Sequence, residues 1–354
     1  MRLGDETVAT FAEALVIKKN IASTVLKNRK IHGVGIGYYD PKHPKKGAAV
    51  ILYANAVSST ALGWGSKFSS LLKGKPINVP IRVVKTKKIR SNASYQDRIR
   101  PVVAGYSIGT TGGSGTAGLI VSSGNQLYVL SNNHVLTNPT NSNNRAETLQ
   151  PGGADEGRTV RDRVGYLSRF VTLKTNGTNR IDAALSRPVR NSILSPKYAT
   201  VGTIPGHVTS YRVGERFKKV GRTTGLTRGR VDSVNTDVQV DYGRDVGVLT
   251  FRNQSIILSD TPVSLPGDSG SVWLRSADNF AAAVNYAGTE DGKTSVAFPV
   301  DWALRALRVR VARPGGQGAG RVKVVDTHNG NAAYTPRLTP KELSMLKVIR
   351  PKSK

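Results

Sequence analysis

One short segment, Leu265–Ser271, carries residues that could perform covalent catalysis. It reads Leu-Pro-Gly-Asp-Ser-Gly-Ser, with Ser269 inside a glycine-rich turn. A serine hydroxyl is a weak nucleophile at neutral pH, so it needs a neighbouring base and a third group that orients the base. Gly, Asp and Ser are also common turn residues, and this segment alone could be an ordinary turn. Partners elsewhere in the chain decide between the two interpretations.

Two polar residues in apolar surroundings could supply the base and the orienting acid. His134 follows the apolar run Leu127–Leu130, which is typical of a strand that ends in a polar loop. Asp182 enters the apolar segment Ile181–Leu185, where a buried acid needs a specific donor such as His134. We therefore predict a catalytic triad of His134, Asp182 and Ser269, in the chain order His, Asp, Ser.

These residues and three further motifs resemble the trypsin-like serine peptidases with the chymotrypsin fold. The resemblance covers about residues 101–310, and its motifs are Gly115–Val121, Val220–Thr227 and Ala283–Gly288. More narrowly, the chain resembles a bacterial branch similar to the plant narrow-leaf peptidases. That branch carries the same Gly-Arg-Thr-Thr-Gly-Leu run and a small preceding domain with a glycine-rich strand, here Gly33–Gly37.

The resemblance implies a mainly β fold with a double six-stranded antiparallel β-barrel and a serine endopeptidase activity without a cofactor. It implies that substrate backbone lies along Tyr286, Ala287 and Gly288. In trypsins an acid six residues before the nucleophile selects Arg or Lys, whereas Val263 occupies that position here. We therefore expect Val263 to contribute to substrate binding and to favour an uncharged, apolar side chain before the cleaved bond.

The residues around the nucleophile also predict an oxyanion hole and a site that forms without zymogen cleavage. Asp268 shapes a turn that points the backbone amides of Gly267 and Ser269 at the developing charge. Digestive relatives in the family pair this acid with a newly cut N-terminus. Here about a hundred residues precede the barrels, and Arg100 is followed by Pro101, a bond that resists tryptic cleavage.

The composition is typical of a chain with small residues and short strands. The 354 residues include 37 glycines, 6% aromatic residues and no cysteine, so neither disulfides nor cysteine-based metal sites are available. The other histidines are scattered and predict no metal site. The first residues lack the apolar core of a signal peptide, and no run reaches the length of a membrane span. We therefore expect a cytoplasmic location.

The net charge of +29 is large and uneven. Residues 1–100 carry 19 basic and 5 acidic side chains, and residues 311–354 carry 9 and 2, so the excess is concentrated outside the peptidase-like region. Such charge could bind nucleic acid or an anionic surface. However, no nucleic-acid motif accompanies it, and basic tails are commonly solvated. The competing hypothesis is a binding or scaffold protein on a peptidase fold, with basic termini that hold such a partner.

The pattern predicts four parts. Residues 1–84 form a small basic α+β module, 85–100 a linker, 101–311 the peptidase domain, and 312–354 a flexible basic tail with a short helix near Thr339. In the module we expect three strands, a short helix over 66–72 and an amphipathic helix over 5–28. The apolar positions of that helix are Val8, Phe11, Ala12, Leu15, Val16, Ile21, Val25 and Leu26. We also expect a homo-oligomer with contacts through residues 1–100 or 321–354, because a peptidase without a zymogen lock needs restricted access.

Overall fold

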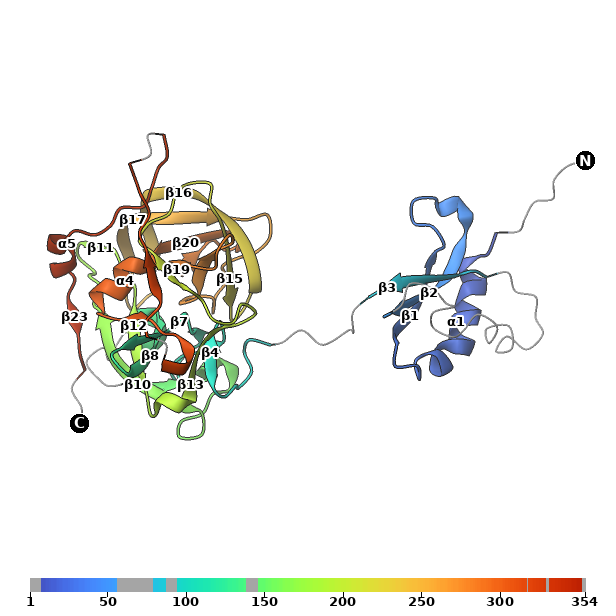
Figure 1. The fold of residues 1–354 in the computed structure, drawn as a ribbon, viewed down its shortest axis with the longest axis horizontal. Coiled ribbons are helices and arrows are strands. Elements are labelled where there is room, and N and C mark those ends of the chain that lie inside the picture. The colour runs from blue at the N-terminus through green and yellow to red at the C-terminus, as the bar shows by residue number, and fades with distance from the viewer. Residues whose placement is uncertain are drawn as a thin grey trace, which may run out of the picture. The chain divides into compact units, whose positions relative to one another are not determined.

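The chain divides into two compact units, residues 1–93 and 94–354, each with its own core (Figure 1). The structure is a computed structural model that describes residues 8–55, 79–86, 94–137, 146–316, 318–328 and 331–351. None of the helices in these ranges is both long and apolar enough to cross a membrane. The helix expected over 66–72 and the central part of the expected linker lie outside the described residues.

The first unit packs a helix against a three-stranded sheet. The helix α1 (Phe11–Val25) begins at a capping box, in which Thr10 and Glu13 satisfy each other's backbone amides. The sheet has the order β1-β2-β3, with an antiparallel first pair and a parallel second pair. Its strands are β1 (Ile31–Tyr38), β2 (Ala48–Ala54) and β3 (Ile81–Lys85), and a 3-10 turn, η1 (Pro44–Lys46), joins the first two.

The helix buries only part of the apolar set that the sequence predicted. Ile17, Ile21 and Val25 are buried against the sheet, whereas Leu15 and Val16 are exposed. The helix starts at Phe11 instead of near residue 5, and residues 11–25 bury a narrow row with three- and four-residue spacing. Of the expected apolar positions, Ile21 and Val25 are thus confirmed as core residues, whereas Val8, Phe11, Leu15, Val16 and Leu26 are exposed.

In the second unit, six segments close the first β-barrel. Neighbouring strands pair in the order β7, β8, β12, β10 and β9. Leu149 of β9 then forms an isolated bridge with Gly109, which directly follows β5, and β5 pairs with β6. The parts of this barrel and its short helices are β4 (Val102–Ala104), β5 (Ser107–Ile108), β6 (Gly115–Thr116), β7 (Leu119–Ser123), β8 (Gln126–Ser131), α3 (Asn133–Leu136), β9 (Glu147–Leu149), η3 (Gly153–Asp155), β10 (Arg163–Val171), β12 (Ala184–Pro188) and η4 (Asn191–Ile193).

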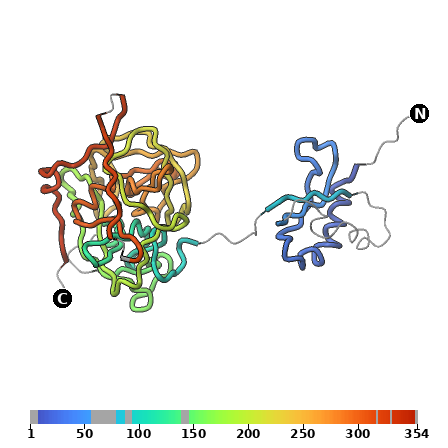
Figure 2. The backbone as a smooth tube through the Cα atoms, viewed as in Figure 1, coloured from blue at the N-terminus to red at the C-terminus, as the bar shows by residue number. Residues whose placement is uncertain are grey.

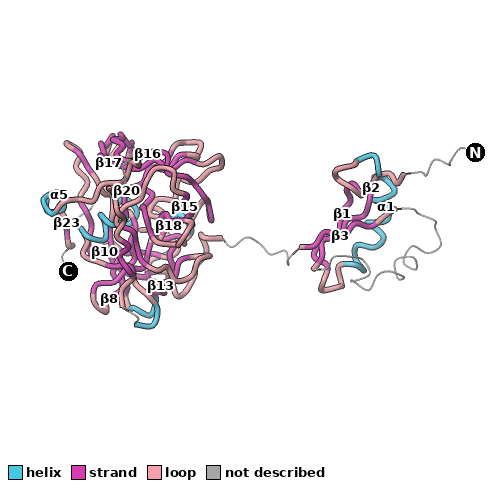
Figure 3. Tube along the Cα trace, turned by 45° about the horizontal axis from the view of Figure 1, so that its top comes forward, coloured by secondary structure: helices cyan, strands magenta, loops and turns pink. Residues whose placement is uncertain are grey.

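Six antiparallel strands form the second barrel, which is closed because β17 pairs with both β16 and β20. The ring runs β17-β16-β15-β18-β19-β20 and back. Its strands are β15 (Arg216–Gly221), β16 (Gly225–Asp241), β17 (Val248–Leu258), β18 (Val272–Arg275), β19 (Ala281–Gly288) and β20 (Thr294–Pro299). Shorter strands extend or flank the barrels, namely β11 (Thr178–Asn179), β13 (Leu194–Tyr198) and β14 (Gly206–Val208). The predicted double six-stranded barrel is thus confirmed, and strands dominate the view in Figure 3.

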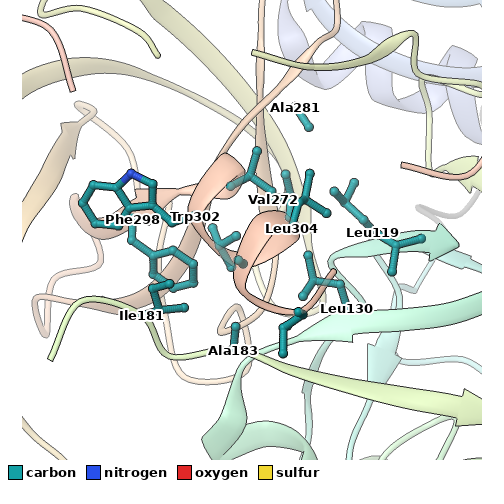
Figure 4. Close-up of a cluster of buried hydrophobic side chains, with 14 of the residues drawn as sticks. Leu119, Leu130, Ile181, Ala183, Val272, Ala281, Phe298, Trp302 and Leu304 are labelled. Atoms are coloured by element: carbon teal, nitrogen blue, oxygen red, sulfur yellow. The ribbon is translucent and has the colours of Figure 1, made fainter. Parts of the chain in front are cut away.

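One hydrophobic core cluster joins the two barrels and fixes the junction between them. Leu119 and Leu130 of the first barrel meet Val272 of the second, and the helix α4 (Val300–Ala306) packs Trp302 and Leu304 into the same cluster (Figure 4). Each of these side chains is at most 1% exposed. Dense packing resists displacement, so loops that leave the two barrels at this junction hold fixed positions.

The C-terminal segment that was expected to be a flexible tail instead follows the surface of the same unit (Figure 2). Its strand β22 (Arg321–Lys323) pairs with β14, and β23 (Val348–Ile349) pairs with β10. Leu338 is 2% exposed in the shared core, and the partly buried Leu343, Leu346 and Val348 pack against the same cluster. The remaining elements of this segment are β21 (Arg310–Val311), η5 (Pro314–Gly316) and α5 (Pro340–Ser344), and α5 starts at a capping box on Thr339.

Candidate active site

The acid and the base meet at the end of the first barrel. His134 lies in α3, directly after β8, and Asp182 lies just before β12, the partner strand of β8. The imidazole Nδ1 is 2.5 Å from Oδ2 of Asp182. The amide of Asn133 donates to Oδ1 of the same carboxylate at 2.6 Å. Because the carboxylate accepts at Nδ1, the proton sits on that nitrogen and Nε2 is free to act as a base.

The carboxyl group of Asp182 is completely buried, yet it stays ionised. Burial acts to raise its pKa, but the charge and hydrogen bond of His134, with help from Tyr242 and Asn133, outweigh burial and hold the pKa below its ordinary value. An ionised acid at this place can orient the imidazole and stabilise its protonated form.

A tyrosine of the second barrel completes the shell around this carboxylate. Tyr242 lies in the turn between β16 and β17, and its hydroxyl donates to Oδ2 of Asp182 at 2.8 Å. Its ring meets that of His134 edge to face, with centroids 5.6 Å apart. Burial first, and then Asp182, raise the pKa of Tyr242 well above its ordinary value, so it remains a donor. The sequence analysis did not identify this residue.

The serine turn lies between β17 and β18, and it faces the first barrel. The hydroxyl of Ser269 donates to the backbone carbonyl of Tyr286 at 3.3 Å in this conformation. Gly270, the next residue, has φ +91°, and a Cβ there would lie 2.4 Å from the carbonyl oxygen of Thr116. Glycine is therefore required where the turn meets the first barrel.

Two backbone amides of the turn are available for an oxyanion. Gly267 has φ +99°, and its carbonyl accepts the hydroxyl of Thr116 at 2.8 Å, so its peptide orientation is fixed. Within the described residues, the amides of Gly267 and Ser269 donate no hydrogen bond to another protein group. Two free donors beside the serine are the arrangement that stabilises a developing negative charge.

The acid before the serine is fully buried and already satisfied. Oδ1 of Asp268 accepts the amides of Thr223 and Thr224, each at 3.0 Å, and Oδ2 accepts the amide of Leu265 at 3.0 Å. The amine of Lys219, also fully buried, lies 3.9 Å from Oδ1. The Gly-Arg-Thr-Thr-Gly run is thereby explained, because its two threonine amides hold the acid that shapes the serine turn.

His134 and Ser269 line one cleft between the barrels, with a volume of about 730 Å³. Gly267 and Pro266 of the serine turn lie on one side, and Glu147 of β9 on the other. Each predicted member of the triad and of the oxyanion hole is therefore placed at the junction. No group of three or more His, Asp or Glu residues that could hold a metal occurs in the described ranges.

The residues that were predicted to contact substrate differ in their exposure. Val263 is 0% exposed and packs with Phe217 and Trp273 in the core of the second barrel, so the expectation that it contacts substrate is wrong. Position alone suggested it, but the side chain turns into the barrel. Tyr286 is also mostly buried and presents its carbonyl to Ser269, whereas Ala287 and Gly288 are partly or fully exposed at the end of β19.

Together, the closed double barrel and the His-Asp pair facing a serine turn define a protein of the chymotrypsin-fold class. It is similar to solved bacterial serine proteases. A glutamic acid specific serine protease is 25% identical with a TM-score of 0.43, and the match covers 60% of this chain and 100% of that one. Nocardiopsis protease is 20% identical with a TM-score of 0.45, over 60% and 99% of the two chains. Cellulomonas bogoriensis chymotrypsin is 22% identical with a TM-score of 0.42, over 60% and 98%. No protein-family model matches the chain, and no curated protein matches it in sequence.

Proposed function

We propose that the protein is a serine endopeptidase that works through an acyl-enzyme. The observation that carries this proposal is the 2.5 Å contact between His134 and the buried Asp182, in a cleft that also holds Ser269. In the reaction, Oγ of Ser269 leaves the carbonyl of Tyr286, to which it donates in this conformation, and turns toward Nε2 of the imidazole. His134 takes the proton as Oγ attacks the peptide carbonyl, and it later gives the proton to the leaving amine.

The backbone around Ser269 stabilises the charge that forms in this step. The amides of Gly267 and Ser269 bind the oxyanion of the tetrahedral intermediate. Asp182 holds the imidazole in the tautomer with the proton on Nδ1, and Tyr242 holds Asp182. Water then attacks the acyl-enzyme by the reverse sequence, with His134 again as the base.

We also propose that this site needs no zymogen cleavage. The buried Asp268 has three backbone donors and the nearby Lys219, all from within residues 94–354. A new N-terminal amine is therefore not needed to neutralise it. These contacts of Asp268 favour a serine turn that takes its shape when the chain folds, without cleavage.

For specificity, we propose a small, uncharged side chain before the cleaved bond. Ser264, Ala287 and Gly288 carry no charge, and the hydroxyl of Ser264 donates to the carbonyl of Ala287 at 3.1 Å. A Cβ at Gly288 would lie 2.8 Å from Oγ of Ser264, so the two segments lie close together. A library of cleaved peptides should show small uncharged residues at this position, and dominance of Arg and Lys would contradict the proposal.

The test of function compares hydrolysis with nucleic-acid binding. The full chain should hydrolyse denatured casein, and Ser269→Ala should not. The control is Ser123→Ala, which changes an exposed serine of the first barrel and should match the wild type. A wild-type protein without turnover that retains DNA with steep salt dependence would instead favour the binding protein.

A further inference from the structure

A small cavity on the first barrel is lined mainly by arginine. Its volume is about 280 Å³, and five guanidinium-bearing residues line it together with Pro101, Val189, Ser192 and Ile193. The five are Arg98, Arg100, Arg161, Arg163 and Arg190. Guanidinium groups repel one another, so a concave surface that gathers five of them is an electrostatic cost unless negative charge offsets it.

Two carboxylates offset only part of this charge. The buried Asp162 pairs with both Arg98 and Arg161, and Glu147 pairs with Arg163. Five cationic groups therefore face two anionic ones, which leaves an excess of three positive charges. Glu147 also lines the active-site cleft, so the ion pair of Glu147 with Arg163 links a residue of that cleft to a residue of the cavity.

The two remaining arginines have no carboxylate partner. Arg100 donates to Gln150 and to the backbone carbonyls of Ile99 and Asp162. Arg190 is exposed, and its guanidinium makes no hydrogen bond or ion pair with another described residue, although its backbone carbonyl accepts the amide of Ile193. Burial, followed by the neighbouring charge of Arg98, lowers the pKa of Arg100 to about 10. This guanidinium is thus held in place by neutral acceptors, and the negative charge that favours it is that of Asp162, which already pairs with Arg98 and Arg161.

An unsatisfied donor lies at the same cavity. Nε of Arg163 is buried and has no hydrogen-bond partner, although a terminal nitrogen of the same side chain pairs with Glu147. A buried donor without a partner costs stability, so a ligand that accepts from it recovers this cost. Several guanidinium groups with open donors match the oxygen atoms of a phosphate group.

From this arrangement we propose that the arginine cavity binds a phosphate group. Arg100 and Arg190 supply positive charge and Arg163 supplies an open donor, and the apolar wall at Pro101 and Ile193 limits the space to a small anion. The site is separate from the proposed peptidase chemistry, so it stands or falls independently of that function.

The test measures binding on the full chain in the Ser269→Ala background, which removes self-digestion from the measurement. The melting temperature is followed as inorganic phosphate replaces sodium chloride at constant ionic strength. It should rise with phosphate, and Arg190→Gln should weaken the fitted affinity about tenfold, the loss expected for one charge-assisted hydrogen bond. Arg163→Gln should have an effect of at least the same size.

Arg228→Gln is the matched control, because it removes the same charge from an exposed arginine of the second barrel. It should bind phosphate like its parent. A parallel titration with O-phosphoserine distinguishes free phosphate from a phosphate carried by a larger molecule, and binding of either one through Arg190 supports the site. No stabilisation beyond that of chloride, or equal stabilisation in Arg190→Gln, would overturn the proposal.

Discussion

At the scale of single residues, the carboxylate of Asp182 depends on donors from both barrels. Asn133 and His134 come from the first barrel, and Tyr242 comes from the second. The tyrosine is therefore a positioning residue, since it acts on the reaction only through Asp182. Its hydroxyl is a donor to a charged group, a bond of about 1.5–3 kcal/mol.

We predict that Tyr242→Phe lowers kcat at least about tenfold and leaves KM nearly unchanged. The ring stays in place, but Asp182 loses one donor, so its pKa rises and the imidazole is less firmly oriented. Tyr211→Phe is the control, because it removes another buried hydroxyl of the second barrel, one that contacts Ser255 instead of Asp182. This variant should lose stability but keep kcat. An unchanged kcat in Tyr242→Phe would contradict the assigned role.

Lys219 makes stability depend on pH. Burial lowers its pKa to about 8, with Asp268 opposing the shift, whereas a lysine in an unfolded chain titrates near about 10.4. Between these values the unfolded chain binds more protons, so stability from this group rises with pH by up to about 1.4 kcal/mol per unit. Below pH 8 the folded chain carries the full cost of a buried charge.

Urea unfolding of Ser269→Ala protein between pH 7 and pH 10 tests this prediction. Relative to Lys219→Met, the chain with Lys219 should gain stability from about pH 8 upward. Lys218→Met changes the neighbouring lysine, which is only half-buried, and should give a curve parallel to its parent. Parallel curves for Lys219→Met as well would show that Lys219 titrates normally in the folded protein.

At the scale of elements, the serine turn can pack against the first barrel only because residue 270 is a glycine. Gly270→Ala would place a Cβ 2.1 Å from Oγ of Ser131, in addition to the strain of a positive φ. We predict a loss of more than about 3 kcal/mol of stability, together with the activity. Gly124→Ala, at φ +55° with open space around it, should cost only about 1 kcal/mol. Thermal unfolding of both variants checks this, and equal losses would contradict it.

The sequence alone was sufficient to predict some residues of the site and not others. His134, Asp182 and the serine turn stand out because each is polar beside an apolar strand. Tyr242 does not, since a tyrosine in a hairpin is ordinary and its partner is 60 residues away in the chain. Nothing in the sequence distinguishes Lys219 from its neighbour Lys218, although the side chain of Lys219 is fully buried.

At the scale of the whole molecule, the C-terminal segment belongs to the barrels. Pairing of β22 and β23 and burial of Leu338 are long-range contacts that its basic, glycine-containing sequence hides. A chain of residues 94–354 should therefore keep the melting temperature and activity of this unit. A chain of residues 94–311 should melt about 10 °C lower, because several buried apolar side chains are lost. Equal melting temperatures of the two chains would contradict this prediction and would favour a flexible tail.

The central claim is that Ser269 is the nucleophile and His134 its base. The most direct measurement is mass spectrometry of the full chain after reaction with a fluorophosphonate. The account predicts one adduct, on the peptide that contains Ser269, which disappears in Ser269→Ala and forms far more slowly in His134→Ala. Labelling that persists in Ser269→Ala, or a folded wild-type protein that takes up no label, would contradict it.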